Sequence, residues 1–173
     1  ADGTMRWIHC GALGVSGGWN PNVHLTCHQR GRPVWNADIA AFVPGKDGPV
    51  GLVAAGAAMG DFSTAGALAA GAKASIDALD GIGITAKPIR LPKAEDAPIN
   101  ISPFWHVSGS SRAWLDQQND VTVKDIKLAH QENFQSVEHL KRYTTLGMAT
   151  DQGKTSNISG LAVMAELAGK SIP

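Results

Sequence analysis

Two apolar runs in the first half of the chain have the pattern of buried β-strands. The first is WIHCGALGV at residues 7–15, which a Ser-Gly-Gly turn follows, and the second is PVGLVAA at residues 49–55, which the small-residue turn GAAMGD follows. Short continuous apolar runs bounded by turn residues are typical of strands inside a sheet. We also expect a short strand at residues 32–35 and an irregular link at residues 36–44.

A helical period of apolar residues begins after the second run. Ser63 is a favourable N-cap, and the apolar positions that follow it recur at about 3.6-residue intervals: Ala65, Leu68, Ala69, Ala72, Ile76 and Leu79. Strand, glycine-rich turn and helix in this order predict an α/β crossover. The first amides of such a helix can bind an anion.

A proline-rich stretch separates this region from the end of the chain. Residues 87–111 contain four prolines and little periodicity, and they end in Ser-Gly-Ser-Ser. This pattern predicts an extended linker, in which we expect Phe104 and Trp105 to anchor on a neighbouring surface. We therefore divide the chain into residues 1–86, a linker at 87–112 and a tail at 113–173.

Three short helices fit the tail. Thr122 caps the first helix, with Asp125 at the capping-box position. Ser136 caps the second helix, and the third runs over about residues 157–168, with Gly169 as its C-terminal stop. Because three short helices make a thin core, we expect the tail to need a partner surface.

The composition is that of a packed, soluble protein. The 173 residues are 43% hydrophobic and carry no net charge, which gives no support for nucleic-acid binding, and no apolar run is long enough to span a membrane. Cys10 and Cys27 read as free thiols in a reducing compartment, so we expect a cytoplasmic location. Because the first apolar run begins almost at once, we expect the chain to be a piece of a longer polypeptide.

The tail contains a stretch dense in cations and hydroxyl groups. Residues 136–157, SVEHLKRYTTLGMATDQGKTSN, contain Lys141, Arg142 and Lys154 together with six serines and threonines. Donors and positive charges at this density usually face an anion or a partner chain. A solvated helix–turn–helix corner is the alternative, because hydroxyl residues and glycines also form ordinary caps and turns.

Two further patterns are weaker than they look. The sequence GKT at residues 153–155 suggests a P-loop, but five residues instead of four separate it from Gly147, and the preceding segment has a helical pattern. His24 and His28 flank Cys27, but the prolines on either side predict a loop where a helical metal site would need a helix. We therefore expect neither nucleotide hydrolysis nor a metal site, and we assign no catalytic residue to this chain.

Two segments in the first half resemble flavoproteins with two dinucleotide-binding domains. VSGGWNPN at residues 15–22 is similar to the turn after one of their strands, and GLVAAGAAMGDFSTAGALAAGAKAS at residues 51–75 is similar to their last strand and helix. The resemblance implies that residues 1–86 are the C-terminal part of an α/β, Rossmann-like FAD/NAD-binding domain. The family's cofactor-contacting aspartate matches Ala57, which argues against ordinary FAD binding, and NAD contacts are expected at Gly56, Ala57 and Gly60.

The tail resembles the α subunit of heterotetrameric sarcosine oxidase. The similarity is carried by DQQNDVTVKDI at residues 116–126 and by the run at residues 136–157, and it extends over the whole chain. It implies oxidative demethylation of sarcosine to glycine with O2, formation of H2O2 and transfer of the one-carbon unit to tetrahydrofolate. It also implies NAD in the α subunit, FMN at a subunit interface and FAD in the β subunit. The expected partners are the β, γ and δ subunits and the remainder of the α subunit.

The tail is also similar to the bacterioferritin-associated-ferredoxin-like (BFD-like) [2Fe-2S] module, which implies a small all-α domain. The four cysteine positions of that module fall at Asp116, Gln118, Asp151 and Ser156. Because an iron–sulfur cluster needs its thiolates, we expect the fold without the cluster.

The cofactor hypothesis assigns two kinds of contact to the polar stretch. The three cations would neutralise the FMN phosphate or pair with the β subunit, and Thr144, Thr145, Gln152 and Thr155 would donate hydrogen bonds to the phosphate or the flavin ring. A second hypothesis is a structural module whose tail only joins subunits. A third is the α subunit of another amine or opine dehydrogenase.

Overall fold

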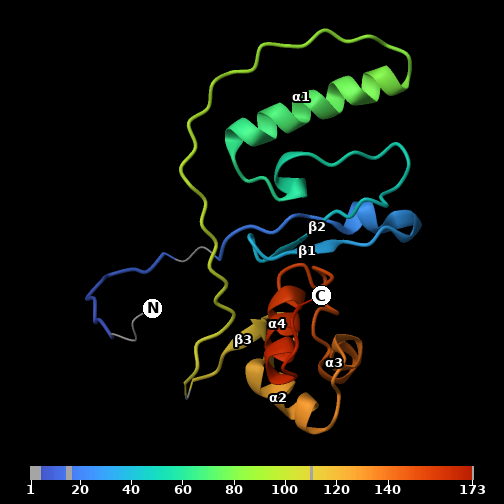
Figure 1. Ribbon diagram of the computed structural model, residues 1–173. Helices are drawn as coiled ribbons and strands as arrows, with labels where there is room; N and C mark the ends of the chain where they lie inside the picture. Colours follow the sequence, from blue (N-terminus) through green and yellow to red (C-terminus); the bar gives the residue numbers. More distant parts are fainter. Residues whose placement is uncertain (1–4, 15–16, 110, 173) are drawn as a thin grey trace.

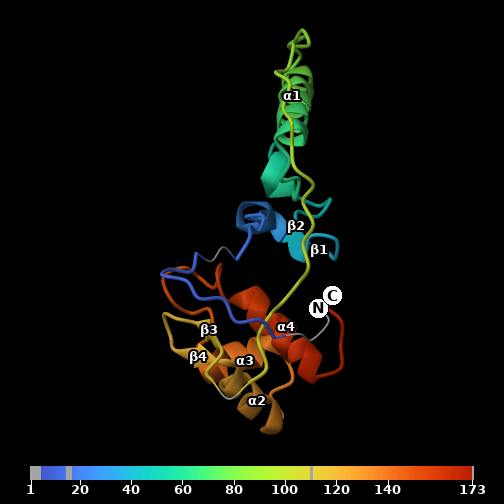
Figure 2. The same ribbon diagram turned by 90° about the vertical axis from the view of Figure 1, so that its left-hand side faces the viewer.

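The computed structural model describes residues 5–14, 17–109 and 111–172. Within these ranges it contains four α-helices, two 3-10 helices and two separate two-stranded sheets, so the chain is mixed α/β. Figures 1 and 2 show an elongated molecule with α1 at one end, the tail helices at the other and the β1–β2 hairpin between them. No helix of the described ranges has the length and apolarity needed to cross a membrane.

Both predicted buried strands are wrong. Residues 7–14 are exposed chain without strand structure, with Trp7 87% exposed, and residue 15 of that run lies outside the described residues. Residues 49–55 form a turn and irregular chain, in which Val50 is 96% exposed. A strand requires a hydrogen-bonded neighbour, and within the described ranges neither run pairs with another strand. The parallel sheet of a Rossmann-like domain is therefore not seen in these ranges.

A short antiparallel hairpin lies between α1 and the tail helices (Figures 1 and 2). After the 3-10 helix η1 (His24–Arg30), β1 (Val34–Asn36) pairs with β2 (Ala41–Val43). The strand expected at residues 32–35 is thus confirmed with a shift, whereas the link expected at residues 36–44 contains β2. Trp35 and Phe42 are register partners, and their rings meet edge to face with centroids 5.1 Å apart.

The helix expected after Ser63 is confirmed as α1 (Thr64–Gly81), where the Ser63 hydroxyl accepts a hydrogen bond from the Gly66 N–H at 3.0 Å. α1 buries none of its residues fully, and it packs against the 3-10 helix η2 (Gly56–Met59) that replaces the expected turn. Gly60 has φ +86°, and a Cβ there would lie 2.7 Å from the Ile39 Cδ1. The turn therefore requires glycine for both its backbone angle and its close approach.

The first amides of α1 bind an anion from the chain itself. The Asp96 carboxylate accepts hydrogen bonds from the Thr64 N–H at 2.6 Å and the Ala65 N–H at 2.9 Å. The Ala65 and Thr64 amides hold the pKa of Asp96 below its ordinary value. The anion expected at such a helix terminus is thus a carboxylate of the linker.

The linker has no regular secondary structure over residues 87–109, as expected. Trp105 packs against the core of the tail, and its ring centroid lies 6.5 Å from that of Trp35. Phe104 is 78% exposed, so only Trp105 of the two expected anchors is confirmed.

The tail contains the three expected helices, α2 (Val123–Gln131), α3 (Val137–Thr144) and α4 (Asn157–Leu167), and the hydrophobic core. The capping box of α2 and the Ser136 cap of α3 are both confirmed. The tail is not all-α, because β3 (Trp114–Asp116) and β4 (Val121–Thr122) form a hairpin before α2. The buried cluster joins this hairpin to all three helices: Val121, Val123, Ile126, Ala129, Leu140, Leu146, Val163 and Met164.

Candidate functional site

A cavity of about 510 Å³ lies where the first half of the chain meets the tail. One wall comes from the segment before η1, from η1 and from the β1–β2 hairpin with Pro33 before it. The other wall comes from Gly153 and Lys154, in the loop before α4, and from Ile158 in the first turn of α4. Its surface is mainly apolar, and the apolar lining residues are Pro21, Val23, Pro33, Phe42 and Ile158. The volume and the apolar lining are those of sites that bind small molecules.

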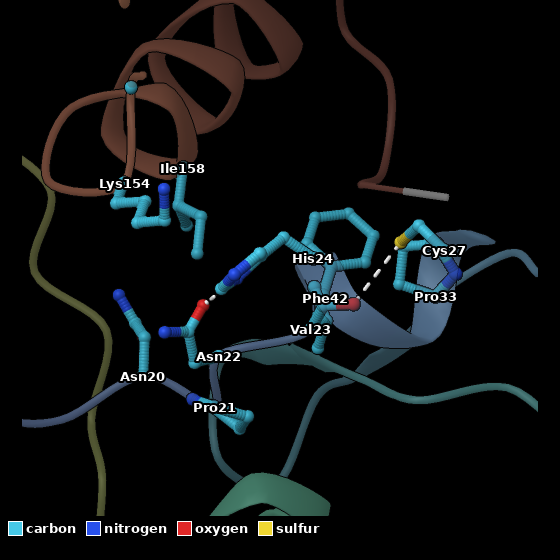
Figure 3. A pocket seen from close by; sticks show the side chains of 11 residues that line it. Asn20, Pro21, Asn22, Val23, His24, Cys27, Pro33, Phe42, Lys154 and Ile158 are labelled. Atoms are coloured by element: carbon cyan, nitrogen blue, oxygen red, sulfur yellow. Dashed lines mark hydrogen bonds between the residues drawn. The ribbon is translucent and has the colours of Figure 1, made fainter. Parts of the chain in front are cut away.

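Polar groups gather at one edge of the cavity. Lys154 and Ile158 extend from the tail toward His24 and Phe42, as Figure 3 shows, with Asn20 and Asn22 on the same side. The His24 Nδ1 and the Asn22 Oδ1 are hydrogen-bonded to one another. The edge thus offers one ammonium group, an imidazole and two amides, which suits a ligand with an aromatic body and an anionic or acceptor end.

Lys154 lies on a loop, residues 145–156, between α3 and α4. Within that loop the Asp151 carboxylate accepts hydrogen bonds from the Thr155 N–H and the Gly153 N–H, both at 3.1 Å, and from the Thr155 hydroxyl. The Thr155 hydroxyl and amide, with the Gly153 amide, keep the pKa of Asp151 below its ordinary value. These bonds hold the residues on both sides of Lys154, Gly153 and Thr155.

Asp116 is a buried carboxylate beside the same loop, 3% exposed. It accepts hydrogen bonds from the backbone N–H of Gln118 at 2.9 Å and of Asn119 at 3.1 Å, within its own turn. From the loop it accepts the Gly147 N–H at 2.9 Å and the Ser156 hydroxyl at 3.4 Å. Burial raises the pKa of Asp116, but the three amides together lower it below its ordinary value. The carboxylate is thus stably ionised although it is buried.

The positions that match the four cysteines of the [2Fe-2S] module lie in this hydrogen-bonded region. Asp116 bonds to Ser156, and the Gln118 Oε1 accepts from the Thr150 hydroxyl at 2.6 Å. Asp151 lies near enough for its charge to act on Asp116. Carboxylates, an amide and hydroxyls therefore form internal hydrogen bonds in the place where the resemblance puts thiolates.

The cations of the predicted cofactor site do not all face one place. Lys154 lines the large cavity, and Lys141 lines an adjoining hollow of about 240 Å³ with Leu161. Arg142 is on the exposed face of α3 and forms an ion pair with Glu138 at 2.7 Å. Only Lys154 of the three therefore reaches the cavity formed with the first half of the chain.

The predicted hydrogen-bond donors are bonded within the tail. The hydroxyls of Thr144 and Thr145 donate to the carbonyls of Leu140 and Thr144, and the Gln152 amide donates to the Ala149 carbonyl. A hydroxyl oxygen retains acceptor capacity after it has donated its proton. Contacts from these three side chains to a cofactor remain predictions.

The residues expected to contact NAD lie in and beside η2. Gly56 is buried, and a Cβ there would lie 3.1 Å from the Ala67 Cβ, while Gly60 faces Ile39. Both glycines thus serve close packing in this structure, and Ala57 between them is exposed. A contact of these residues with NAD remains a prediction.

Sequence reasoning missed the other half of the cavity. His24, Phe42 and Ile158 were not predicted as site residues, because they come together only through packing of the hairpin on the tail. Two local patterns noted in the sequence do fall on this half of the cavity: the Trp-Asn-Pro-Asn turn contributes Asn20 and Asn22, and the His24–Cys27–His28 pattern, weighed there as a metal site, contributes His24 and Cys27.

Comparisons with known proteins agree with the expected resemblance. Residues 110–173 match the family model of the sarcosine oxidase A3 domain. The chain is 40% identical over 173 residues to the sarcosine oxidase subunit alpha of Rhizobium meliloti (strain 1021), an alignment that covers 98% of the chain and 17% of that protein. It is 36% identical over 181 residues to the subunit of the same name from Corynebacterium sp. (strain U-96), covering 99% of the chain and 18% of that protein.

The corresponding protein of Corynebacterium sp. (strain P-1) is also 36% identical, over 180 residues. The chain thus spans less than a fifth of the length of these curated relatives. Their name, subunit alpha, implies that those proteins belong to multi-subunit enzymes. The resemblance expected from the sequence is therefore confirmed: the chain is similar over nearly its whole length to one part of sarcosine oxidase α subunits, and its tail matches their A3 domain.

Proposed function

We propose that the chain acts as part of the α subunit of a sarcosine oxidase. The enzyme would convert sarcosine to glycine with O2, form H2O2 and pass the one-carbon unit to tetrahydrofolate. The remainder of the α subunit and the β, γ and δ subunits are the proposed partners, with FAD in the β subunit and NAD in the α subunit. The similarity to α subunits over nearly the whole chain supports this assignment.

For this segment we propose a role at the edge of FMN, where a partner subunit meets the chain. The donor set fits such a group: the cavity has apolar walls for an aromatic ring, and Lys154 supplies a positive charge at its edge. FMN supplies the electron transfer to oxygen when it is bound. The chain's own residues would bind and orient it, and the ammonium group of Lys154 would favour an anionic phosphate or a reduced, anionic flavin. The observation that carries the proposal is the position of Lys154 at this cavity.

The experiment is to replace Lys154 by alanine in the assembled oxidase and to measure FMN content, FMN affinity and turnover. Loss of a charge-assisted contact predicts FMN affinity lower by about tenfold or more. Lys170→Ala is the matched control, because Lys170 is an exposed lysine beyond the end of α4. Unchanged FMN affinity and turnover in Lys154→Ala would refute the role at the FMN edge.

A second candidate is a module that only joins subunits. Its support is an exposed face around the end of α3, where Tyr143 is 41% and Met148 is 55% exposed beside the Arg142–Glu138 ion pair. Arg142→Ala and Met148→Ser distinguish the two candidates. If the variant complexes assemble poorly but keep their full FMN content, the joining role is favoured. If the complexes assemble well but lose FMN, joining subunits is not the whole function of the chain.

A further inference from the structure

The turn between β3 and β4 is tied to the loop that carries Lys154. We call residues 116–119 the clamp turn and residues 145–156 the Lys154 loop. The Asn119 side-chain amide donates to the Thr145 carbonyl at 2.8 Å, and the Thr150 hydroxyl donates to the Gln118 side chain at 2.6 Å. Asn119 and Thr145 are 26 residues apart in sequence, and Gln118 and Thr150 are 32 apart. The two bonds therefore stabilise tertiary structure and not local structure.

Asp116 supplies the buried member of these ties, and it acts at both ends of the loop. A single oxygen, Oδ2, accepts from the Gly147 N–H near the start of the Lys154 loop and from the Ser156 hydroxyl at its end. Its other oxygen holds the clamp turn through the amides of Gln118 and Asn119. The carboxylate therefore joins the clamp turn, the start of the Lys154 loop and, through the Ser156 hydroxyl, the end of that loop.

The space inside the loop allows little adjustment. Gly147 and Gly153 have φ values of +68° and +75°, and a Cβ on either would lie 1.9–2.1 Å from side-chain atoms of Asn157. The loop thus closes around Asn157, and Asp151 secures the residues on both sides of Lys154. A displacement of Gly147 or Ser156 would be passed along this closed loop to Lys154.

We propose that Asp116 is a positioning residue for the cavity: its buried carboxylate holds both ends of the Lys154 loop, so that Lys154 faces the ligand. Hydrogen bonds from amides to a carboxylate are stronger than those between neutral groups. An asparagine at this position keeps only one acceptor oxygen. Its N–H groups would face either the Gly147 N–H and Ser156 or the amides of Gln118 and Asn119, so at least one backbone N–H would lose its acceptor. The identity of the ligand at the cavity depends on the proposed function. The clamp itself depends only on the hydrogen bonds described above.

The test is Asp116→Asn in the assembled complex that contains the full chain, with two independent readouts. The first is hydrogen exchange of residues 145–156, expected to be about tenfold faster while α2 and α4 keep their protection. The second is FMN affinity, expected to fall by a similar factor. Asp120→Asn is the matched control, because Asp120 is exposed in the same hairpin. If Asp116→Asn does not fold, the double variant Gln118→Ala, Asn119→Ala removes two exposed ties and is expected to loosen the same loop.

Unchanged exchange of residues 145–156 in Asp116→Asn overturns the clamp. Where Asp116→Asn does not fold, unchanged exchange of the same residues in the double variant overturns it. A loosened loop with unchanged FMN affinity, where Lys154→Ala does weaken FMN, overturns the positioning role. If Lys154→Ala also leaves FMN affinity unchanged, the proposed function fails instead, and the clamp is judged by the exchange result alone. Restored protection and affinity in Asp116→Glu relative to Asp116→Asn supports the requirement for a carboxylate.

Discussion

Replacement of Gly160 by alanine tests how tightly α4 packs on the rest of the tail. Gly160 is buried at the end of the first turn of α4, and a Cβ there would lie 2.4 Å from the Cδ2 of Leu146. Leu146 is itself only 1% exposed, so its methyl group cannot turn into solvent. Overpacking of this kind typically costs about 1–3 kcal/mol, whereas alanine gains roughly 1 kcal/mol over glycine inside a helix. The difference is a net loss of about 0–2 kcal/mol. Because a separation of 2.4 Å is far shorter than an ordinary Cβ contact, we expect the loss of stability in α4 to lie in the upper half of that range.

Gly71→Ala is the matched control in α1, where a Cβ meets no atom within 4 Å. The same change there should stabilise α1 by about 0.5–1 kcal/mol. Native-state hydrogen exchange measures the free energy of opening of each helix separately. In the Gly160→Ala background, Leu146→Ala should cost at least about 1 kcal/mol less than in the parent chain, because it removes the clash. Equal or greater stability of α4 in Gly160→Ala, or the absence of that coupling, would refute the described packing.

Two further changes test the caps. Because the pKa of Asp96 is lowered in the folded chain, its contribution is full above the ordinary aspartate pKa of about 3.9 and is lost as the pH falls through the folded-state pKa. The amides of the first turn of α1 should therefore lose protection, measured against the intrinsic exchange rate at each pH, in that acid range. Asp96→Asn should remove this pH dependence of protection; a dependence of protection that persists contradicts the cap. Thr122→Ala breaks the capping box with Asp125 and should destabilise α2 by about 1 kcal/mol in the same exchange experiment, and unchanged α2 protection counts against it.

Local signals predicted the parts of the fold that depend on a few neighbouring residues. Ser63, Thr122 and Ser136 were identified as caps because a cap needs only its own side chain and the amides of the next turn. The strands expected at residues 7–15 and 49–55 failed because a strand depends on a partner elsewhere. The β3–β4 hairpin was not predicted, because its strands have three and two residues and are too short to show an alternating pattern.

In the candidate site, too, the sequence predicted what depends on neighbouring residues and missed what depends on distant ones. Lys154 was selected by the density of donors around it, and it does line the cavity. Arg142 was selected by the same rule, but helical spacing pairs it with Glu138 on the outer face of α3. The role of Asp116 depends on contacts with residues 31 and 40 positions away in the sequence. In the sequence it was noted only because it occupies a cysteine position of the [2Fe-2S] module.

The bond between Asp96 and α1 changes the length of chain that connects the two ends of the molecule. With Asp96 fixed to the start of α1 and Trp105 packed on the tail, the connecting span is residues 97–104 and not the whole linker. At about 3.3–3.6 Å per residue, its contour length is roughly 30 Å. Residues added before Asp96 would enlarge a closed loop on α1 and leave this reach unchanged, whereas residues added after it would extend the reach directly.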